Sequence, residues 1–253
     1  MKRHLVAIVT VSIVGVLAPT PVFAQQPCPC AATPDQGKWI GTAGAGLALT
    51  SGNSDTLNLN LSFDATYDPK TRHVLKATGL YIRGDQNDVV VVNRLSLGFR
   101  DQYTFSGHAF AFAQLDYLRD TFKAIDYLVA PTIGVGYTMI DTMPTTFAVD
   151  GGVGAVWEKN PGVDVDADVA LTAGERLQHV LTPTSNVHHA ATALWKANDL
   201  NDGLYTFSVG AGAKLSGRLQ LSVDLLDTLE NRPPATATKK NDVALVTSIT
   251  ATF

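Results

Sequence analysis

The chain has very few cysteines and no interior hydrophobic run long enough to form a membrane helix. Its two cysteines, Cys28 and Cys30, lie in a PCPC stretch near the N-terminus. One residue between them is too short for an easy disulfide, and two thiols alone make a poor metal site. Beyond the first 24 residues no apolar stretch approaches the roughly 20 residues of a membrane-spanning helix. Any insertion into a membrane must therefore be by strands.

Charge of either sign is also scarce. Charged residues make up 17% of the chain and the formal net charge is −4. Nucleic-acid binding depends on a basic patch or a basic excess, and this composition has neither. We therefore expect no nucleic-acid partner.

The first 24 residues predict a secretory signal peptide. Lys2 and Arg3 precede an apolar run at 5–17, and small residues, Val22 and Ala24, stand at the two positions that a signal peptidase reads. The sequence therefore predicts a signal peptide at 1–24, a flexible periplasmic lead-in at 25–38 and one β-structured domain at 39–253.

From Trp39 onward the sequence is a series of alternating apolar and polar runs. In TLNLNLSFDATY (56–67) the odd positions are apolar and the even ones polar, which is the pattern of a strand with one apolar face. The runs are about ten to fourteen residues long, whereas soluble strands average about 5–6 and membrane strands need roughly 9–11. Strands are predicted at 39–50, 56–67, 73–83, 91–103, 108–118, 126–139, 146–158, 168–180, 185–197, 203–215, 218–228 and 242–253.

The connections between these runs alternate in character. One set is tight, at 68–72, 105–107, 141–145, 181–184 and 216–217, and the other set is mostly longer and more polar, at 83–88, 119–125, 159–166 and 229–241. Short turns on one rim and long loops on the other are typical of an outer-membrane barrel with both termini in the periplasm. The first turn, at 51–55, is short although it belongs to the second set.

Aromatic residues on the apolar face fall at the two ends of the predicted strands. They form two girdles around a band of Ala, Val, Leu, Ile and Phe, as expected at the two water–lipid boundaries of a membrane barrel. Because hydrocarbon cannot satisfy free backbone groups, the last strand must pair with the first. The sequence therefore predicts an all-β fold, a closed antiparallel up-and-down transmembrane β-barrel of about 12 strands. Phe253 is expected to be a girdle residue and an assembly signal.

The segment at 168–180 departs from this pattern. Glu175 shares the parity of Leu171 and Ala173, which would place a carboxylate on the apolar face. A β-bulge here would shift the phase of the strand, and the sequence leaves the register of this segment open.

Several stretches resemble the bacterial salt-induced outer-membrane protein family, a domain of unknown function. The first hairpin, GLALTSGNSDTLNLNLS (46–62), is the most specific, and RDTFKAIDY (119–127) and NRPP followed by KKNDV (231–243) resemble the central loop and last hairpin of the family. The resemblance implies a β-barrel in the outer membrane. It supplies no substrate, reaction or binding residue.

The polar face of the strands is expected to line the barrel lumen with charges of both signs. Such charges either tune the selectivity of a pore or pair with one another and fill it. The expected function is a narrow, weakly selective channel for small solutes or ions, or a plugged structural barrel. The ten candidate charges are Asp64, Lys76, Arg94, Arg100, Asp116, Asp150, Glu158, Lys196, Lys214 and Asp224.

Two other function classes stay open. A lipid hydrolase needs a nucleophile beside a histidine, and the nearest candidates are Ser185, His188 and His189, at the wrong rim and with the two histidines on opposite faces. A soluble periplasmic barrel would instead hold an apolar ligand inside. We expect no catalytic, cofactor or metal site. The expected partners are outer-membrane lipid and the barrel assembly machinery.

Overall fold

The computed structural model describes residues 37–51, 56–86, 89–121, 123–233 and 239–253. The predicted signal peptide and most of the predicted lead-in lie outside these residues. Among the described residues no helix is long and apolar enough to cross a membrane.

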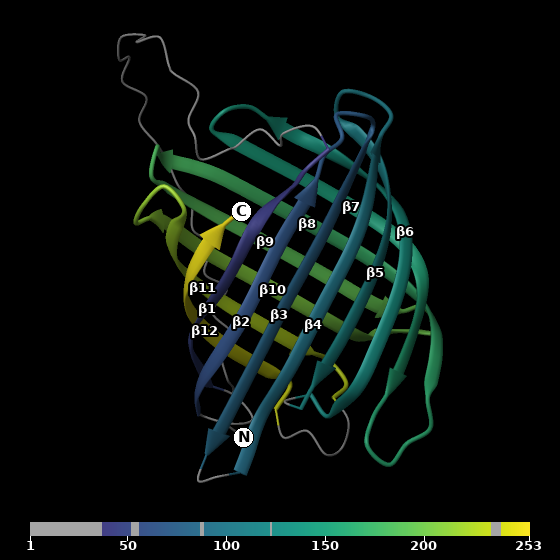
Figure 1. Cartoon of the computed structure of the whole chain (residues 1–253). Helices are drawn as coiled ribbons and strands as arrows, with labels where there is room; N and C mark the ends of the chain where they lie inside the picture. The colour runs from purple at the N-terminus through teal and green to yellow at the C-terminus, as the bar shows by residue number, and fades with distance from the viewer. Residues whose placement is uncertain (1–36, 52–55, 87–88, 122, 234–238) are drawn as a thin grey trace, which may run out of the picture.

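Twelve antiparallel strands form one closed barrel (Figure 1). Each strand pairs with its two sequence neighbours, and β1 pairs with β12 to close the ring. The predicted strand number, order and closure are confirmed. The strands are β1 (Trp39–Ser51), β2 (Thr56–Tyr67), β3 (His73–Gln86), β4 (Val89–Thr104), β5 (Ala109–Asp120), β6 (Ile125–Asp141), β7 (Thr145–Lys159), β8 (Asp166–Thr182), β9 (Ser185–Lys196), β10 (Asp199–Lys214), β11 (Leu219–Glu230) and β12 (Asn241–Thr252).

The closing seam continues past the last strand. The Phe253 amide donates to the Gly41 carbonyl at 3.0 Å, and the Gly41 amide donates to the Phe253 carbonyl at 3.2 Å. The ring of Phe253 is exposed at this end of the barrel, which we call the terminal rim; the opposite end is the loop rim. The seam thus satisfies backbone groups that would otherwise form two free sheet edges.

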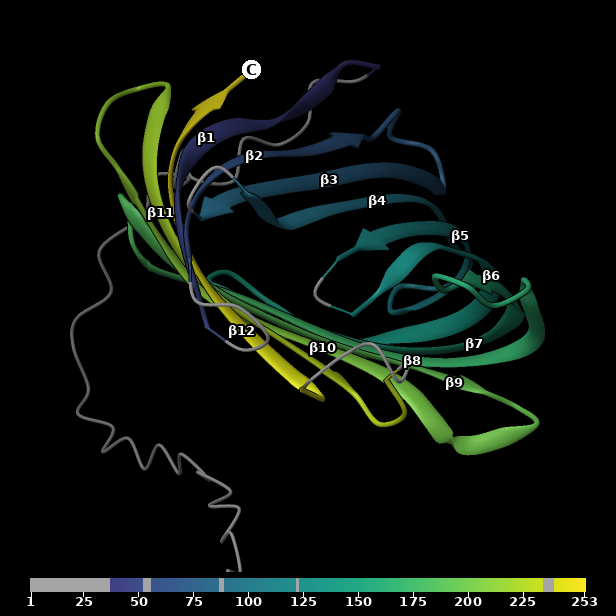
Figure 2. The same cartoon turned by 90° about the horizontal axis from the view of Figure 1, so that it is seen from below.

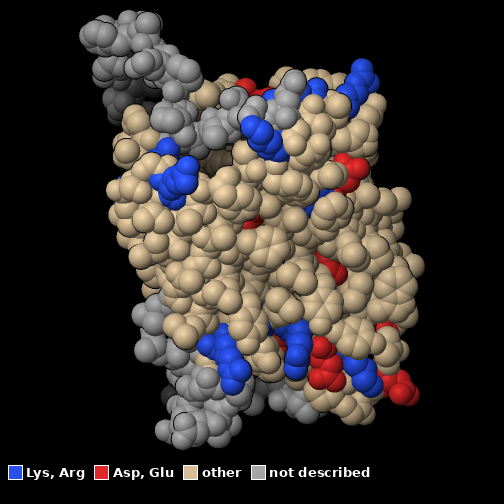
Figure 3. Space-filling view, viewed as in Figure 1, with Lys and Arg blue, Asp and Glu red and all other residues tan. Residues whose placement is uncertain are grey.

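Side-chain alternation separates the two faces of the wall. On β2, Leu59 is 73% exposed and Leu61 58% exposed, whereas Asn60 between them is 2% exposed. On the side shown in Figure 3, most of the charged side chains lie toward the two ends, and the band between them is almost entirely uncharged. This outer band is the apolar face that the sequence predicted.

The connections at the loop rim are shorter than the sequence predicted. β3 extends to Gln86 and β4 begins at Val89, so most of the predicted loop at 83–88 is strand. The predicted loop at 119–125 shortens to 121–124 in the same way, and only two residues join β9 to β10. Polar composition alone suggested loops here, but continued strand pairing satisfies more backbone groups than an open loop does.

The strand register that the sequence left open is regular at Glu175, with no bulge there. The pairing of β7 with β8 runs without a shift from Thr145 opposite His179 to Glu158 opposite Asp166, and the pairing of β8 with β9 shifts only near Val180. Glu175 therefore faces outward, where its carboxylate lies 2.8 Å from His189 Nε2 on β9. A polar partner on the neighbouring strand makes the change of phase unnecessary.

The hydrogen bonds of His189 fix the charge of this outward pair. His189 Nδ1 lies 3.0 Å from the Ser208 carbonyl, which can only accept, so Nδ1 carries a proton. Nε2 then either donates a hydrogen bond to an ionised Glu175 or accepts a hydrogen bond from a neutral one. In both cases the pair has no net charge, which suits an apolar band.

The barrel is flattened rather than circular (Figure 2). Two inward aromatic rings contribute to its filled interior: Phe110 is 2% exposed and Phe112 is 6% exposed. Glycines on β6 make room for them, since a Cβ at Gly134 would overlap Phe112 and one at Gly136 would overlap Phe110. The inward glycines are therefore partly occupied by rings and do not simply widen the lumen.

Arginine at position 61 tests the assignment of the outer face. Leu61→Arg places a charge near the middle of the apolar band and is expected to lower the free energy of unfolding in lipid vesicles by about 2–4 kcal/mol. Ser62→Arg is the matched control, because its side chain enters the lumen near Asp64 and should have a much smaller effect. Equal losses in urea titrations of the two variants would contradict the assignment.

Phe253 has two separable roles at the seam. Deleting it removes a ring and both hydrogen bonds to Gly41, whereas Phe253→Ala removes only the ring. We expect the deletion to lower the yield of heat-modifiable barrel in the membrane fraction more than the substitution does. A normal yield from the deletion would show that neither feature is needed for assembly.

The Glu175–His189 pair predicts non-additive mutations. His189→Leu leaves a carboxylate without its partner in the apolar band and should cost about 2 kcal/mol of stability. The double variant Glu175→Leu, His189→Leu should regain most of that loss, because the pair is then replaced by apolar side chains. Additive losses in a double-mutant cycle of unfolding free energies would contradict the pairing.

Candidate functional site: the barrel lumen

All ten charges predicted to line the lumen lie on the inward face of their strands. The pairing registers place them beside other inward residues, with Lys76 opposite Arg100, Asp116 opposite Gly98 and Asp224 opposite Gly210. The structure groups them into separate levels along the barrel and does not spread them evenly. We describe these levels from the terminal rim toward the loop rim.

The level nearest the terminal rim holds three predicted charges. Lys214 lies at the end of β10 opposite Gln220. His188 Nε2 on β9 lies 2.6 Å from Asp224 Oδ1 on β11. Asp64 lies on the inward face of β2, opposite Thr42 on β1 and Thr78 on β3.

The middle level is organised around Arg100. Its guanidinium lies 3.1 Å from Asp150 Oδ2 and donates to Gln114 Oε1 at 2.8 Å, and Gln114 in turn donates to Asp116 at 2.6 Å. The guanidinium also lies over the Phe112 ring, 3.8 Å from its centroid, in a cation–π contact. Arg100 is 7% exposed, so its position is fixed from several sides.

Arg176 belongs to the same level and was not predicted. It forms an ion pair with Asp150, so that one carboxylate lies between two guanidinium groups. The sequence signal was its even position in β8, next to Glu175. The open register of this segment hid it, because a bulge that turned Glu175 inward would have turned Arg176 outward.

Above the middle level the inward face is apolar. Eight side chains from β5 to β10 pack together, and a second apolar group lies on β3, β11 and β12. The sequence did not predict this apolar level. Its members are Leu118, Ile125, Leu128, Ala130, Val156, Ala170, Leu194 and Leu204 on the first side, and Leu80, Ile82, Leu226, Ala244 and Val246 on the second.

At the loop rim two cationic side chains connect opposite walls. Arg94 on β4 pairs with Asp120 at 3.1 Å and donates to Thr228 Oγ1 on β11 at 3.0 Å. Between β4 and β11 the ring of strands contains β3, β2, β1 and β12, so this bond crosses the lumen.

Lys123, in the β5–β6 connection, makes the second crossing. It pairs with Asp242 on β12 at 3.0 Å and donates to the Lys240 carbonyl at 2.6 Å. Figure 2, seen from the loop rim, shows the β5–β6 connection inside the ring of strands. Lys123 has no exposed surface, which shows that this end of the lumen is filled.

A cavity of about 170 Å³ extends along the lumen between the middle and apolar levels. Three arginines and two of the predicted carboxylates belong to its polar lining. Leucines of the apolar level are among its other lining residues. The charged lining residues are Arg94, Arg100, Arg176, Asp116 and Asp150.

Comparison with known proteins identifies the family. A family model described as a protein of unknown function, DUF481, matches residues 43–253. The chain belongs to the DUF481 family. This agrees with the resemblance to a domain of unknown function, and the family description contains nothing about salt. No curated protein matches the chain.

Solved structures similar to this DUF481 barrel are outer-membrane proteins. The NanC porin is 8% identical over 85% of this chain and 99% of its own, with a TM-score of 0.55. An outer membrane channel from Pseudomonas putida F1 is 14% identical over 87% and 96%, with a TM-score of 0.52. The translocator domain of the autotransporter NalP from Neisseria meningitidis is 10% identical over 88% and 91%, with a TM-score of 0.51. At these identities the similarity shows the fold alone.

The residues considered for hydrolysis are not assembled in the DUF481 barrel. Ser185 Oγ hydrogen bonds with Thr182 Oγ1 at 2.7 Å, while His188 faces Asp224 and His189 faces Glu175. The two histidines point to opposite faces of the sheet, as predicted. Among the described residues no group of three or more His, Cys, Asp or Glu side chains is arranged to hold a metal ion.

Proposed function

We propose that this DUF481 chain is a narrow outer-membrane channel for small solutes or ions, closed at the loop rim in the structure. The main support for this proposal is that side chains close the lumen at the loop rim. Arg94 and Lys123 cross the lumen and fill it, yet each is held by one or two polar partners on the far wall. Side-chain bonds of this kind can break without unfolding the barrel.

The cavity below this closure supports transport over a purely structural role. Paired charges line this cavity but do not fill it, whereas a plug of paired charges would leave no such space. A narrow lumen with paired charges is expected to pass small solutes with weak ion selectivity. The fold resemblance to a porin and to an outer membrane channel agrees with this role.

A plugged structural barrel is the second candidate. Complete burial of Lys123 and Asp120 favours it, because buried charges with fixed partners open reluctantly. In either case we place the protein in the outer membrane with both termini in the periplasm, in contact with lipid and inserted by the barrel assembly machinery. We expect no enzymatic activity.

Planar-bilayer conductance separates the two candidates. The double variant Arg94→Ala, Lys123→Ala removes both crossings and is expected to raise the single-channel conductance severalfold over a small wild-type value. Arg218→Ala, an exposed residue in the turn before β11, is the matched control and should behave as the wild type. Reversal potentials in a salt gradient would report the selectivity.

The outcomes assign the role. Silence from both the wild type and the double variant, with insertion shown by heat-modifiable migration, would contradict a channel and favour the structural barrel. A large wild-type conductance would instead contradict the closure at the loop rim.

A further inference from the structure

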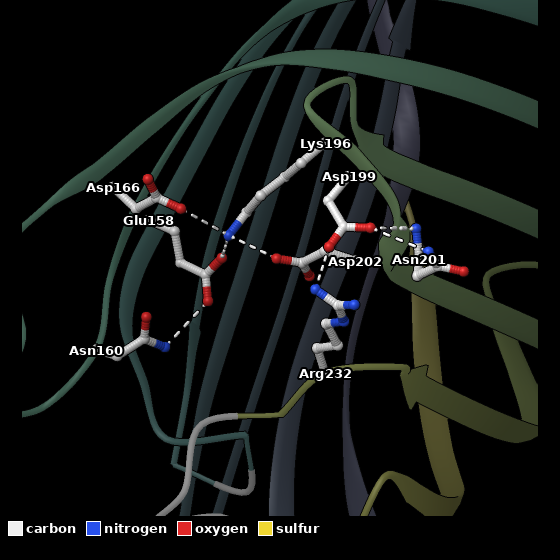
Figure 4. A network of polar contacts seen from close by, with 8 residues as sticks. All are labelled: Glu158, Asn160, Asp166, Lys196, Asp199, Asn201, Asp202 and Arg232. Carbon is white, nitrogen blue, oxygen red and sulfur yellow. Dashed lines mark hydrogen bonds and ion pairs between the residues drawn. The ribbon is translucent and has the colours of Figure 1, made fainter.

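Lys196 lies within a ring of carboxylates at the loop rim (Figure 4). Its ammonium nitrogen is 3.1 Å from Glu158, 3.0 Å from Asp166 and 3.1 Å from Asp202, on β7, β8 and β10. A lysine ammonium has three donors, and these three carboxylates use all of them. Lys196 therefore has no donor left for a fourth carboxylate.

Glu230 is that fourth carboxylate. It lies at the end of β11, is only 5% exposed, and its Oε2 has no hydrogen-bond partner among the described residues. The other cations of this level are engaged elsewhere, Arg94 with Asp120 and Lys123 with Asp242. A buried carboxylate without a partner is strongly unfavourable when ionised, so its environment calls for a cation or a proton.

The Glu230 side chain lines a small void of about 10 Å³. That volume holds about one water-sized species. One side of the void is acidic and the other is apolar. The charged side consists of the carboxylates Glu158, Asp202 and Glu230 together with Lys196, and the apolar side consists of Ile125, Leu128, Leu194 and Leu204.

The surrounding charge also favours a cation. The described inward residues of the loop rim include seven carboxylates, against the three cations Arg94, Lys123 and Lys196. The carboxylates are Asp120, Glu158, Asp166, Asp168, Asp202, Glu230 and Asp242.

We propose that the void beside Glu230 binds one ammonium ion, which is about the size of a water molecule. The described residues contain no carboxylate or histidine group arranged to hold a metal ion, whereas an ammonium ion needs only hydrogen-bond acceptors around a water-sized space. The apolar side of the void excludes the hydration shell that an alkali cation would keep. Lys196 shows that the same carboxylates already hold one ammonium group. The site does not depend on conduction.

Ion-dependent stability of the full chain in lipid vesicles tests the proposal. The thermal unfolding midpoint is measured by heat-modifiable migration in ammonium, methylammonium, sodium and tetramethylammonium chloride at one ionic strength. A ligand that binds only the folded state raises this midpoint. We expect ammonium to raise it above the sodium value, and methylammonium and tetramethylammonium, which are both too large for the void, to leave it at the sodium value.

Variants locate the effect. Glu230→Gln keeps the shape but removes the charge and should weaken the apparent ammonium affinity roughly tenfold, the scale of one charge-assisted hydrogen bond. Leu204→Phe fills the void while Glu230 stays intact, and it should abolish the ammonium effect on the unfolding midpoint. This second variant keeps the test valid if Glu230→Gln folds poorly. Asp141→Asn, at the terminal rim, is the matched control and should retain the full effect.

Two results would overturn the proposal. Equal midpoints in sodium and ammonium would show that no ammonium ion is selected. A carboxylic-acid carbonyl band in the infrared spectrum that vanishes in Glu230→Gln, together with no ammonium effect, would show that Glu230 is instead neutralised by a proton.

Discussion

The structure depends on one constraint: every backbone amide and carbonyl group in the wall needs a partner within the wall. Hydrocarbon supplies no hydrogen bonds, so a sheet that faces it must close on itself. The β1–β12 seam meets this requirement, and the bonds between Gly41 and Phe253 extend it to the terminal rim. Once the ring is closed, strand alternation fixes which side chains face outward and which face the lumen.

Closure also determines what the lumen can contain. A ring of twelve strands is intermediate between small filled barrels and wide porins. Flattening brings opposite walls together, so that Arg94 reaches Thr228 and Lys123 reaches Asp242. The interior is consequently held by bonds across the lumen as well as by bonds along the wall, and these cross-lumen bonds decide how much open space the lumen has.

The sequence predicted the wall well because the wall depends on local pattern. The period of two in β2 was enough to place Leu61 outside and Asn60 inside, and the same parity placed all ten lumen charges on the inward face. The pattern does not say which charges meet. Besides Asp120 on the adjacent strand, Arg94 bonds to Thr228, a residue separated from it by 134 positions, and the flattened cross-section brings these two together.

Two features of the interior and the wall could not be read from the local pattern. At Glu175 the pattern left the register open; His189 on the adjacent strand pairs with the outward carboxylate, and a single strand carries no information about its neighbour. The apolar level was hidden because both faces of the wall are apolar there, as at Leu225 and Leu226, where alternation gives no contrast.

That hidden level determines how the charges behave. If the inward charges were spread evenly, those of opposite sign could screen one another along the whole lumen. Here apolar side chains separate the middle level, where Arg100 and Arg176 share Asp150, from the loop rim, where carboxylates exceed cations. Arginines below the leucines are too far away to neutralise a carboxylate above them, and the leucines exclude water that would otherwise screen it. The excess negative charge at the loop rim must therefore be balanced locally, by a proton or by a cation that enters from outside.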